Sequence, residues 1–77
     1  MATEIVMPQM GTDMTDGKLL RWLKQEGDAV AAGEAIVEIE TDKVNVEVEA
    51  EHAGVLRRIL VHEGESVPVG TSIGLLD

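Results

Sequence analysis

An internal repeat constrains the fold of this 77-residue chain more than any other feature. Residues 17–40 and residues 54–77 align without a gap at a constant offset of 37 positions. The sequence of each copy predicts a strand, a tight turn, a brief strand, a second turn and a third strand. Each copy would then have one apolar face that it cannot bury by itself. Two copies related by an approximate two-fold axis would cover each other, so we expect an all-β fold, a small sandwich or flattened barrel. The identical positions are Gly17/Gly54, Leu19/Leu56, Arg21/Arg58, Leu23/Leu60, Glu26/Glu63, Gly27/Gly64, Val30/Val67, Gly33/Gly70 and Ile36/Ile73.

The composition agrees with one small folded domain over residues 1–77. The chain is 44% hydrophobic, which argues against disorder, and it has no cysteine, so disulfides cannot stabilise it. No apolar run approaches the roughly 18 to 20 residues that a membrane span requires. The strands that we predict are Glu4–Met7, Lys18–Lys24, Ala35–Thr41, Val44–Ala50, Gly54–Val61 and Ser72–Leu76, with shorter extended segments around Val30 and Val67.

A hairpin is predicted in the middle of the chain, where the apolar period changes parity. Val37 and Ile39 are the apolar positions before residue 41, whereas Val46 and Val48 are the apolar positions after residue 43. An antiparallel hairpin with an even-numbered loop produces this switch. We therefore place the loop within residues 40–43 as a type I turn centred on Asp42 and Lys43.

Lys43 is thus predicted at the tip of this hairpin. The offset of 37 maps position 43 to position 6 and to position 80, which are the two ends of the chain. The hairpin tip and the chain ends should therefore lie at opposite ends of the molecule. From these observations alone, an ordinary surface lysine among acidic neighbours is the alternative interpretation of Lys43.

The inventory of reactive side chains is poor, and we assign no catalytic residue and no metal site. The chain has no cysteine or tyrosine, and His52 and His62 have no spacing typical of a metal motif. The glutamates alternate along predicted strands, which is typical of a solvated face. Among the methionines of the first loop and for Trp22, packing is the favoured interpretation.

The segment Glu38-Ile39-Glu40-Thr41-Asp42-Lys43-Val44 resembles the lipoylation signature of the lipoyl domains in 2-oxo acid dehydrogenase complexes. The opening Met7-Pro8-x-Met10-Gly11 and the repeat itself resemble the same family, so the likeness covers essentially the whole chain. It implies a flattened barrel of two four-stranded antiparallel sheets with a pseudo-two-fold axis.

By this resemblance, Lys43 carries lipoic acid as an amide, and the domain is a mobile carrier, a swinging arm, with no catalysis of its own. A thiamine-diphosphate-dependent decarboxylase would acylate the lipoyl group, an acyltransferase would take the acyl group, and dihydrolipoamide dehydrogenase would reoxidise the dithiol. A lipoate ligase or lipoyl transferase would attach the cofactor. Recognition around the tip is expected to involve Glu40, Thr41, Asp42, Val44, Gly11, Thr12 and Asp13. The parent chain would be a dihydrolipoamide acyltransferase, with pyruvate or acetoin complexes favoured by analogy.

Three other functions were weighed. A biotin carrier domain shares the fold, but its usual tip is Met-Lys-Met, whereas Asp42 and Val44 flank the lysine here. An unmodified adaptor barrel would have no reason to keep a lysine within Glu-Thr-Asp-Lys. An enzyme is the third and weakest option, because no set of side chains could be placed in catalytic roles.

The charge and the start of the chain carry the remaining expectations. A formal charge of -9 speaks against nucleic acid or an anionic membrane as partner. The first four residues lack the features of a signal or transit peptide, which predicts a cytoplasmic protein if Met1 is the native start. A mature mitochondrial fragment is the alternative, and the isolated domain is expected to be a monomer.

Overall fold

The computed structural model describes residues 3–41 and 44–77, and within them the chain is built from eight strands. The predicted strands are confirmed in number and order, with ends that differ by at most two residues. The strands are β1 (Thr3–Val6), β2 (Asp16–Trp22), β3 (Ala29–Val30), β4 (Ala35–Glu40), β5 (Asn45–Glu49), β6 (Gly54–Ile59), β7 (Ser66–Pro68) and β8 (Ser72–Leu76).

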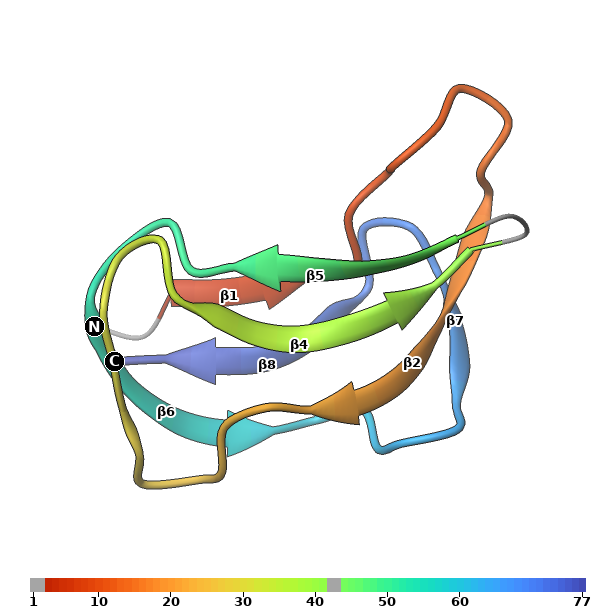
Figure 1. Ribbon diagram of the computed structural model, residues 1–77. Helices are drawn as coiled ribbons and strands as arrows, with labels where there is room; N and C mark the ends of the chain where they lie inside the picture. Colours follow the sequence, from red (N-terminus) through yellow and green to blue (C-terminus); the bar gives the residue numbers. More distant parts are fainter. Residues whose placement is uncertain (1–2, 42–43) are drawn as a thin grey trace.

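Two four-stranded antiparallel sheets face each other, as the resemblance implied (Figure 1). One sheet has the order β5-β4-β2-β7, and the other has the order β1-β8-β6-β3. The repeat maps β2, β3 and β4 onto β6, β7 and β8, so the two sheet orders are equivalent. The shortest strand of each half, β3 or β7, belongs to the sheet formed mainly by the other half. Lys18 of β2 pairs with Ser66 of β7, and Ala29 of β3 pairs with Val55 of β6.

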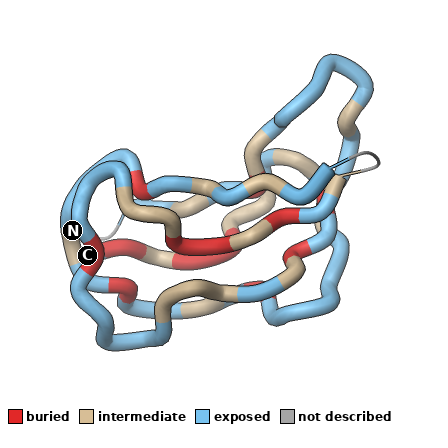
Figure 2. Tube along the Cα trace, viewed as in Figure 1, coloured by how far each residue is buried: buried red, intermediate tan, exposed pale blue. Residues whose placement is uncertain are grey.

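The core between the sheets consists of repeat mates. Leu19 and Leu56 are both fully buried, and so, to within 1%, are Ile36 and Ile73. Burial is concentrated on the strands between the two layers (Figure 2). Two equivalent apolar faces therefore close on each other, which is why neither copy needs a disulfide or a second domain to bury its side chains.

The two halves are also tied together by matching hydrogen bonds. The backbone N–H of Leu19 donates to Glu65 O and that of Leu56 donates to Asp28 O, each at 2.9 Å. The repeat mates Glu26 and Glu63 form a further pair of matching hydrogen bonds. The carboxylate of Glu63 accepts a hydrogen bond from the Trp22 backbone N–H at 3.2 Å. In the same way, the carboxylate of Glu26 accepts from the Ile59 backbone at 2.8 Å.

Glycine is required at the turns of both copies. Gly27 and Gly64 have φ angles of 95° and 88°, in the left-handed region that side chains with a Cβ rarely adopt. Gly33 and Gly70, the second pair of mates, have φ angles of 84° and 90°. The sequence predicted tight turns at these sites, and the backbone conformation explains why glycine occupies both members of each pair.

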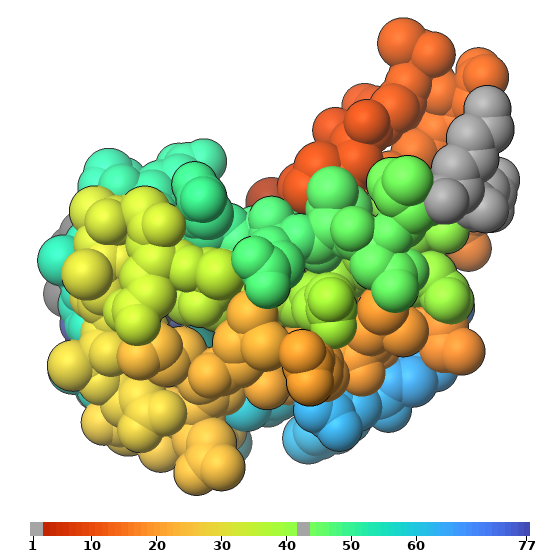
Figure 3. All heavy atoms as spheres, viewed as in Figure 1, coloured from red at the N-terminus to blue at the C-terminus, as the bar shows by residue number. Residues whose placement is uncertain are grey.

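The halves differ in one connection. Met7 and Ala50 occupy equivalent places, since Met7 exchanges backbone hydrogen bonds with the turn at Gly70 and Thr71, and Ala50 does so with the turn at Gly33 and Glu34. From these points, residues 8–16 lead to Gly17, whereas only residues 51–53 lead to Gly54. The first connection is therefore six residues longer than its counterpart, and it projects from the barrel (Figures 1 and 3).

Trp22 and the methionines fit the packing interpretation only in part. The indole N–H of Trp22 donates to Val61 O at 2.9 Å, so this side chain anchors one sheet to the other. Met7 is fully buried and Met14 packs against the core, but Met10 is 42% exposed. Over the residues described, no helix is long and apolar enough to cross a membrane.

Candidate functional site

The site begins with the β4–β5 hairpin, whose register follows the predicted parity. Ile39 pairs with Val46, and Glu40 pairs with Asn45. Val37 and Ile39 point into the core, whereas Glu40 is exposed. The even-numbered loop predicted from the parity is confirmed, because continuing the register pairs Thr41 with Val44 and leaves two positions between them.

Hydrogen bonds hold the last described residues of the hairpin together. The backbone N–H of Thr41 donates to Val44 O at 2.9 Å. The Thr41 hydroxyl donates to the same carbonyl at 2.7 Å and accepts from the Val44 N–H at 3.2 Å. The two residues that follow Thr41 are therefore connected to a backbone with a fixed register. Those residues, Asp42 and Lys43, lie outside the described part of the chain, and so does the predicted type I turn.

The hairpin end and the described chain ends lie at opposite ends of the barrel, as the repeat predicted. Figure 1 shows β4 running away from the C-terminus towards the hairpin, with β1 and β8 starting and ending at the other side. The molecule measures 31 × 20 × 19 Å along its principal axes. A group attached beyond Thr41 would thus be presented at the pole opposite to any segment joined to the C-terminus.

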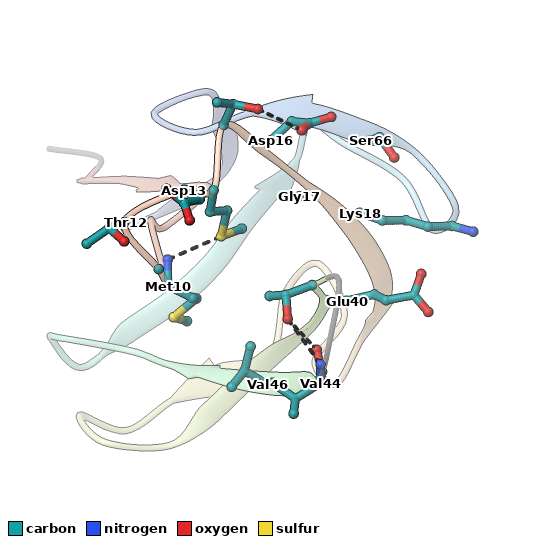
Figure 4. Close-up of a pocket in the computed structure, with 14 residues that line it drawn as sticks. Met10, Thr12, Asp13, Asp16, Gly17, Lys18, Glu40, Val44, Val46 and Ser66 are labelled. Atoms are coloured by element: carbon teal, nitrogen blue, oxygen red, sulfur yellow. Dashed lines mark hydrogen bonds between the residues drawn. The ribbon is translucent and has the colours of Figure 1, made fainter.

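The first loop stands beside this hairpin and forms a groove with it. The groove has a volume of about 720 Å³, and loop residues 10–16 line one of its walls. The hairpin supplies Glu40, Thr41, Val44 and Val46, and the paired strands β2 and β7 supply Lys18 and Ser66. Figure 4 shows Met10 on the loop side and Val44 and Val46 on the hairpin side.

The groove contains both apolar and acidic groups. Val44 is 59% exposed and Met10 is 42% exposed, and both side chains line the groove. The acidic members are Asp13, Asp16 and Glu40, with Lys18 as the cationic side chain in the same lining. The loop wall is held by its own contacts, since the Met10 N–H donates to Met14 Sδ at 3.2 Å and the Met14 N–H donates to Gly11 O at 3.1 Å.

The structure therefore gathers most of the recognition residues predicted from the sequence. Glu40, Thr41 and Val44 share one groove with Gly11, Thr12 and Asp13, although these two sets are almost thirty residues apart in sequence. The sequence did not indicate Lys18, Val46 and Ser66 as groove residues, and for Met10 and Met14 it favoured packing over a contact surface. Ser66 enters through the pairing of β2 with β7, which links the two halves and leaves no local signal.

In the parts of the chain that are described, no group of three or more His, Asp or Glu side chains could hold a metal ion. The ion pairs found there lie elsewhere on the surface. Lys24 Nζ lies 2.7 Å from Glu34 Oε2, and Arg57 contacts Asp77 at 2.6 Å. The distinctive feature of this pole is thus a hairpin of fixed register beside a groove.

Comparisons with known proteins identify the family of this two-fold symmetric barrel. The model of the biotin/lipoyl family, described as "Biotin-requiring enzyme", matches residues 3–76. The lipoyl domain of the 2-oxoglutarate dehydrogenase complex from Azotobacter vinelandii superposes with a TM-score of 0.79 and 42% identity, covering 96% of this chain and 94% of that one. The chain therefore belongs to the biotin/lipoyl family and, within it, to the lipoyl domains.

Two longer relatives are acyltransferase components. The chain is 52% identical over 73 residues to the dihydrolipoyllysine-residue succinyltransferase component of the 2-oxoglutarate dehydrogenase complex of Staphylococcus saprophyticus, covering 95% of this chain and 17% of that protein. It is 48% identical over 73 residues to a chloroplastic dihydrolipoyllysine-residue acetyltransferase component of the pyruvate dehydrogenase complex of Arabidopsis thaliana, covering 95% of this chain and 15% of that protein. The chain thus spans less than a fifth of either relative.

Proposed function

We propose that this domain carries a lipoyl group on Lys43. The observation that carries the proposal is the hydrogen-bonded pairing of Thr41 with Val44 at the pole opposite the described chain ends. The segment between those two residues contains Lys43 within a Glu-Thr-Asp-Lys-Val sequence. Membership of the lipoyl domains supports lipoate over biotin as the attached group, and so does the absence of methionine on either side of the lysine.

The attached lipoyl group would supply the redox-active sulfur atoms that the side chains of this protein lack. The sequence contains no cysteine, so its own side chains offer no dithiol for redox or acyl-transfer chemistry. Lipoate, joined through an amide to the Lys43 Nζ, supplies a dithiolane that can be reduced and acylated. Amide formation removes one positive charge and takes the formal charge from -9 to -10, a change that follows from the sequence count.

The partners follow from the longer relatives. The parent chain is an acyltransferase component of a 2-oxo acid dehydrogenase complex, in which the domain meets a thiamine-diphosphate-dependent decarboxylase, the acyltransferase core and dihydrolipoamide dehydrogenase. A lipoate ligase or lipoyl transferase attaches the cofactor. The domain contributes mobility and a high local concentration of the acyl carrier and catalyses none of these steps. Relatives from both 2-oxoglutarate and pyruvate complexes are similar to the chain, so the preference for pyruvate or acetoin stays a prediction.

Recognition by those partners would use the residues around the hairpin. Glu40, Thr41 and Val44 lie beside the attachment segment, and Gly11, Thr12 and Asp13 face them across the groove. Asp42 is included among the proposed recognition residues because it precedes Lys43 in the sequence. A cytoplasmic location is proposed from the bacterial relative, with an organellar location, as in the chloroplastic relative, as the alternative.

The intact mass of the domain tests this function. The purified protein is incubated with lipoate, ATP and a lipoate ligase, and compared with Lys43→Arg, which keeps the charge but cannot form the amide. Lys18→Arg is the matched control, because Lys18 is also a lysine near the groove. One lipoyl addition to the wild type and to Lys18→Arg, with none on Lys43→Arg, supports the proposal. A biotinyl addition by a biotin ligase alone would establish the biotin carrier instead, and no addition at all would favour the adaptor barrel.

A further inference from the structure

The outer face of the sheet β5-β4-β2-β7 carries a row of charged side chains across three neighbouring strands. Arg21 of β2 pairs with Glu38 of β4, and Glu38 pairs with Glu47 of β5. Arg21 and Glu38 also form an ion pair, with 3.0 Å between Arg21 Nε and Glu38 Oε1. The arginine of this row therefore has a carboxylate on the next strand of its own sheet.

The equivalent row on the other sheet lacks that carboxylate. Its members are Arg58 of β6, Leu75 of β8 and Glu4 of β1, since Leu75 pairs with the other two residues. The repeat equates Arg58 with Arg21 and Leu75 with Glu38, so a leucine occupies the place of the carboxylate. Arg58 is exposed, and within the described part of the chain it forms no ion pair. The second sheet thus presents an arginine whose mate is paired and which is itself unpaired.

Apolar side chains surround this second row. Leu75 points away from the core, because its neighbour Leu76 is buried and successive residues of a strand point to opposite faces. Val55 on β6 and Val6 on β1 are each 42% exposed, and each precedes a fully buried residue. At the three equivalent places the first sheet carries charged side chains, which are Glu38, Lys18 and Glu49. The barrel therefore does not require apolar residues there, and exposed apolar groups gathered on one face are typical of an interaction surface.

We propose that this surface is a contact surface for a second copy of the chain. We call it the β8 face, and it consists of Glu4, Val6, Val55, Arg58 and Leu75. The strands that carry it lie side by side in one layer of the barrel (Figure 1). A two-fold axis parallel to β8 and above Leu75 places the β8 faces of two copies against each other. Arg58 of each copy then faces Glu4 of the other, which supplies the carboxylate that the row lacks.

The order of the side chains makes the β8 face complementary to itself. Leu75 lies on the central strand of the row, with the cation of Arg58 on one side and the anion of Glu4 on the other. Reversal of this row by the two-fold axis brings opposite charges together and two leucines together at the axis. The row of the first sheet cannot pair in this way, because two copies of Glu38 would meet at the axis and like charges destabilise such a contact. The preference for one of the two sheets follows from this difference.

The dimensions of the face limit the strength of the contact. The molecule is 31 Å long and 20 Å wide, so two such faces bury at most roughly 1,200 Å² in total, which is the low end for specific interfaces. The formal charge of -9 on each copy adds a repulsion that physiological salt screens beyond about 8 Å. We expect a dissociation constant of about 1 mM, so the domain stays a monomer in dilute solution and pairs where two copies are held close together.

Dilution of the unmodified, ¹⁵N-labelled domain tests the contact. With a dissociation constant of about 1 mM, about 60% of the chains are paired at about 2 mM protein and about 10% at about 0.05 mM. Amide signals of Glu4, Val6, Arg58 and Leu75 should therefore move on dilution, and those of Glu47 on the other sheet should not. Sedimentation equilibrium at the higher concentration should give an average mass clearly above the 8.3 kDa of one chain.

A pair of matched variants tests the apolar part of the face. Leu75→Glu introduces the carboxylate of the first sheet, which gives Arg58 an acceptor on its own sheet and puts two like charges at the axis. Pairing should weaken at least roughly tenfold. Leu20→Glu is the control, because Leu20 is a half-buried leucine of the other sheet, and its repeat mate Arg57 shows that a charged side chain is tolerated at this place. This control should pair as the wild type does.

A charge exchange tests the polar part and does not depend on how Leu75→Glu folds. Arg58→Glu replaces two attractive contacts in the pair by two repulsive ones and should weaken pairing roughly tenfold. Adding Glu4→Arg to Arg58→Glu restores opposite charges at both contacts, so the double variant should pair as the wild type does. The amide spectrum of each variant confirms that it is folded.

The outcomes decide the proposal without reference to the lipoyl group. Loss of pairing in Arg58→Glu with recovery in the double variant would support it. A mass of one chain and unchanged amide signals for the wild type at about 2 mM would overturn it. Equal pairing of the wild type and all variants would also overturn it, because another surface would then hold the copies together. The β8 face does not include Lys43, so this inference and the carrier function can fail separately.

Discussion

The two halves of this barrel share a core but differ in what joins their strands. Leu19 and Leu56 are buried to the same extent, and equivalent hydrogen bonds connect each half to the other. The connections that follow Met7 and Ala50 differ by six residues, and the longer one lines the groove beside the hairpin. The contacts that stabilise the core therefore occur in both halves, whereas the proposed attachment site lies at the pole where the connections of the two halves differ.

The largest effect is expected from Leu19→Ala and Leu56→Ala, which truncate fully buried mates. Each should lower the free energy of unfolding by about 2–5 kcal/mol, because a cavity is left at the centre of the core. Urea denaturation of both variants measures the losses, and symmetric packing predicts similar values. Losses that differ by more than about twofold would show that one half dominates the core.

A smaller loss is expected from Glu26→Ala and Glu63→Ala. Each variant removes a carboxylate that accepts a backbone N–H from the opposite half, at 2.8 Å from Ile59 and 3.2 Å from Trp22. Hydrogen bonds to charged groups contribute about 1.5–3 kcal/mol, and because both bonds are exposed to solvent, each loss should not exceed the lower end of that range. Hydrogen exchange of the Ile59 and Trp22 amides checks the cause, because each amide should lose protection only in the variant that lacks its own acceptor.

Gly27→Val and Gly64→Val should each cost about 1–3 kcal/mol, since valine would have to adopt a positive φ. An added Cβ meets no atom within 4 Å at either site, so the cost lies in the backbone and not in a clash. Thermal unfolding measures it. Gly11→Ala is the control, because its Cβ also meets nothing and its φ lies outside the positive range. A comparable loss in Gly11→Ala would contradict this explanation.

The smallest effect concerns an ion pair that only the first half contains. The hydrogen bond from Lys24 lowers the pKa of Glu34 below its ordinary value, and the Ala31 N–H adds to the shift. The repeat mates of these two residues are Val61 and Thr71, so the second half has no counterpart.

A carboxylate with a lowered pKa stabilises the fold above its unfolded pKa and loses this contribution as pH falls through the folded pKa. Glu34→Gln should therefore lower the melting temperature slightly at neutral pH and not at strongly acidic pH. Melting curves across that range check this, with the exposed Glu51→Gln as control. An equal difference at every pH would exclude the ion pair as the cause.

The same comparison shows what the sequence could reveal. The offset of 37 and the parity switch around residue 42 predicted the strands, the two layers and the hairpin register, because burial imposes period two on each strand. Glu26 and Glu63 were visible as identical mates, but their bonds to the opposite half were not. Ser66 and Met10 reach the groove through strand exchange and an inserted loop, and neither leaves a periodic signal.

The most direct test of the central claim, that the hairpin presents its lysine by position, is to exchange Asp42 and Lys43. The combined change Asp42→Lys with Lys43→Asp keeps the composition and the net charge, and it moves the amine by one position in the sequence. Intact mass after incubation with lipoate and a lipoate ligase should show one lipoyl addition on the wild type and little or none on the exchanged variant. Equal modification of both proteins would contradict the claim.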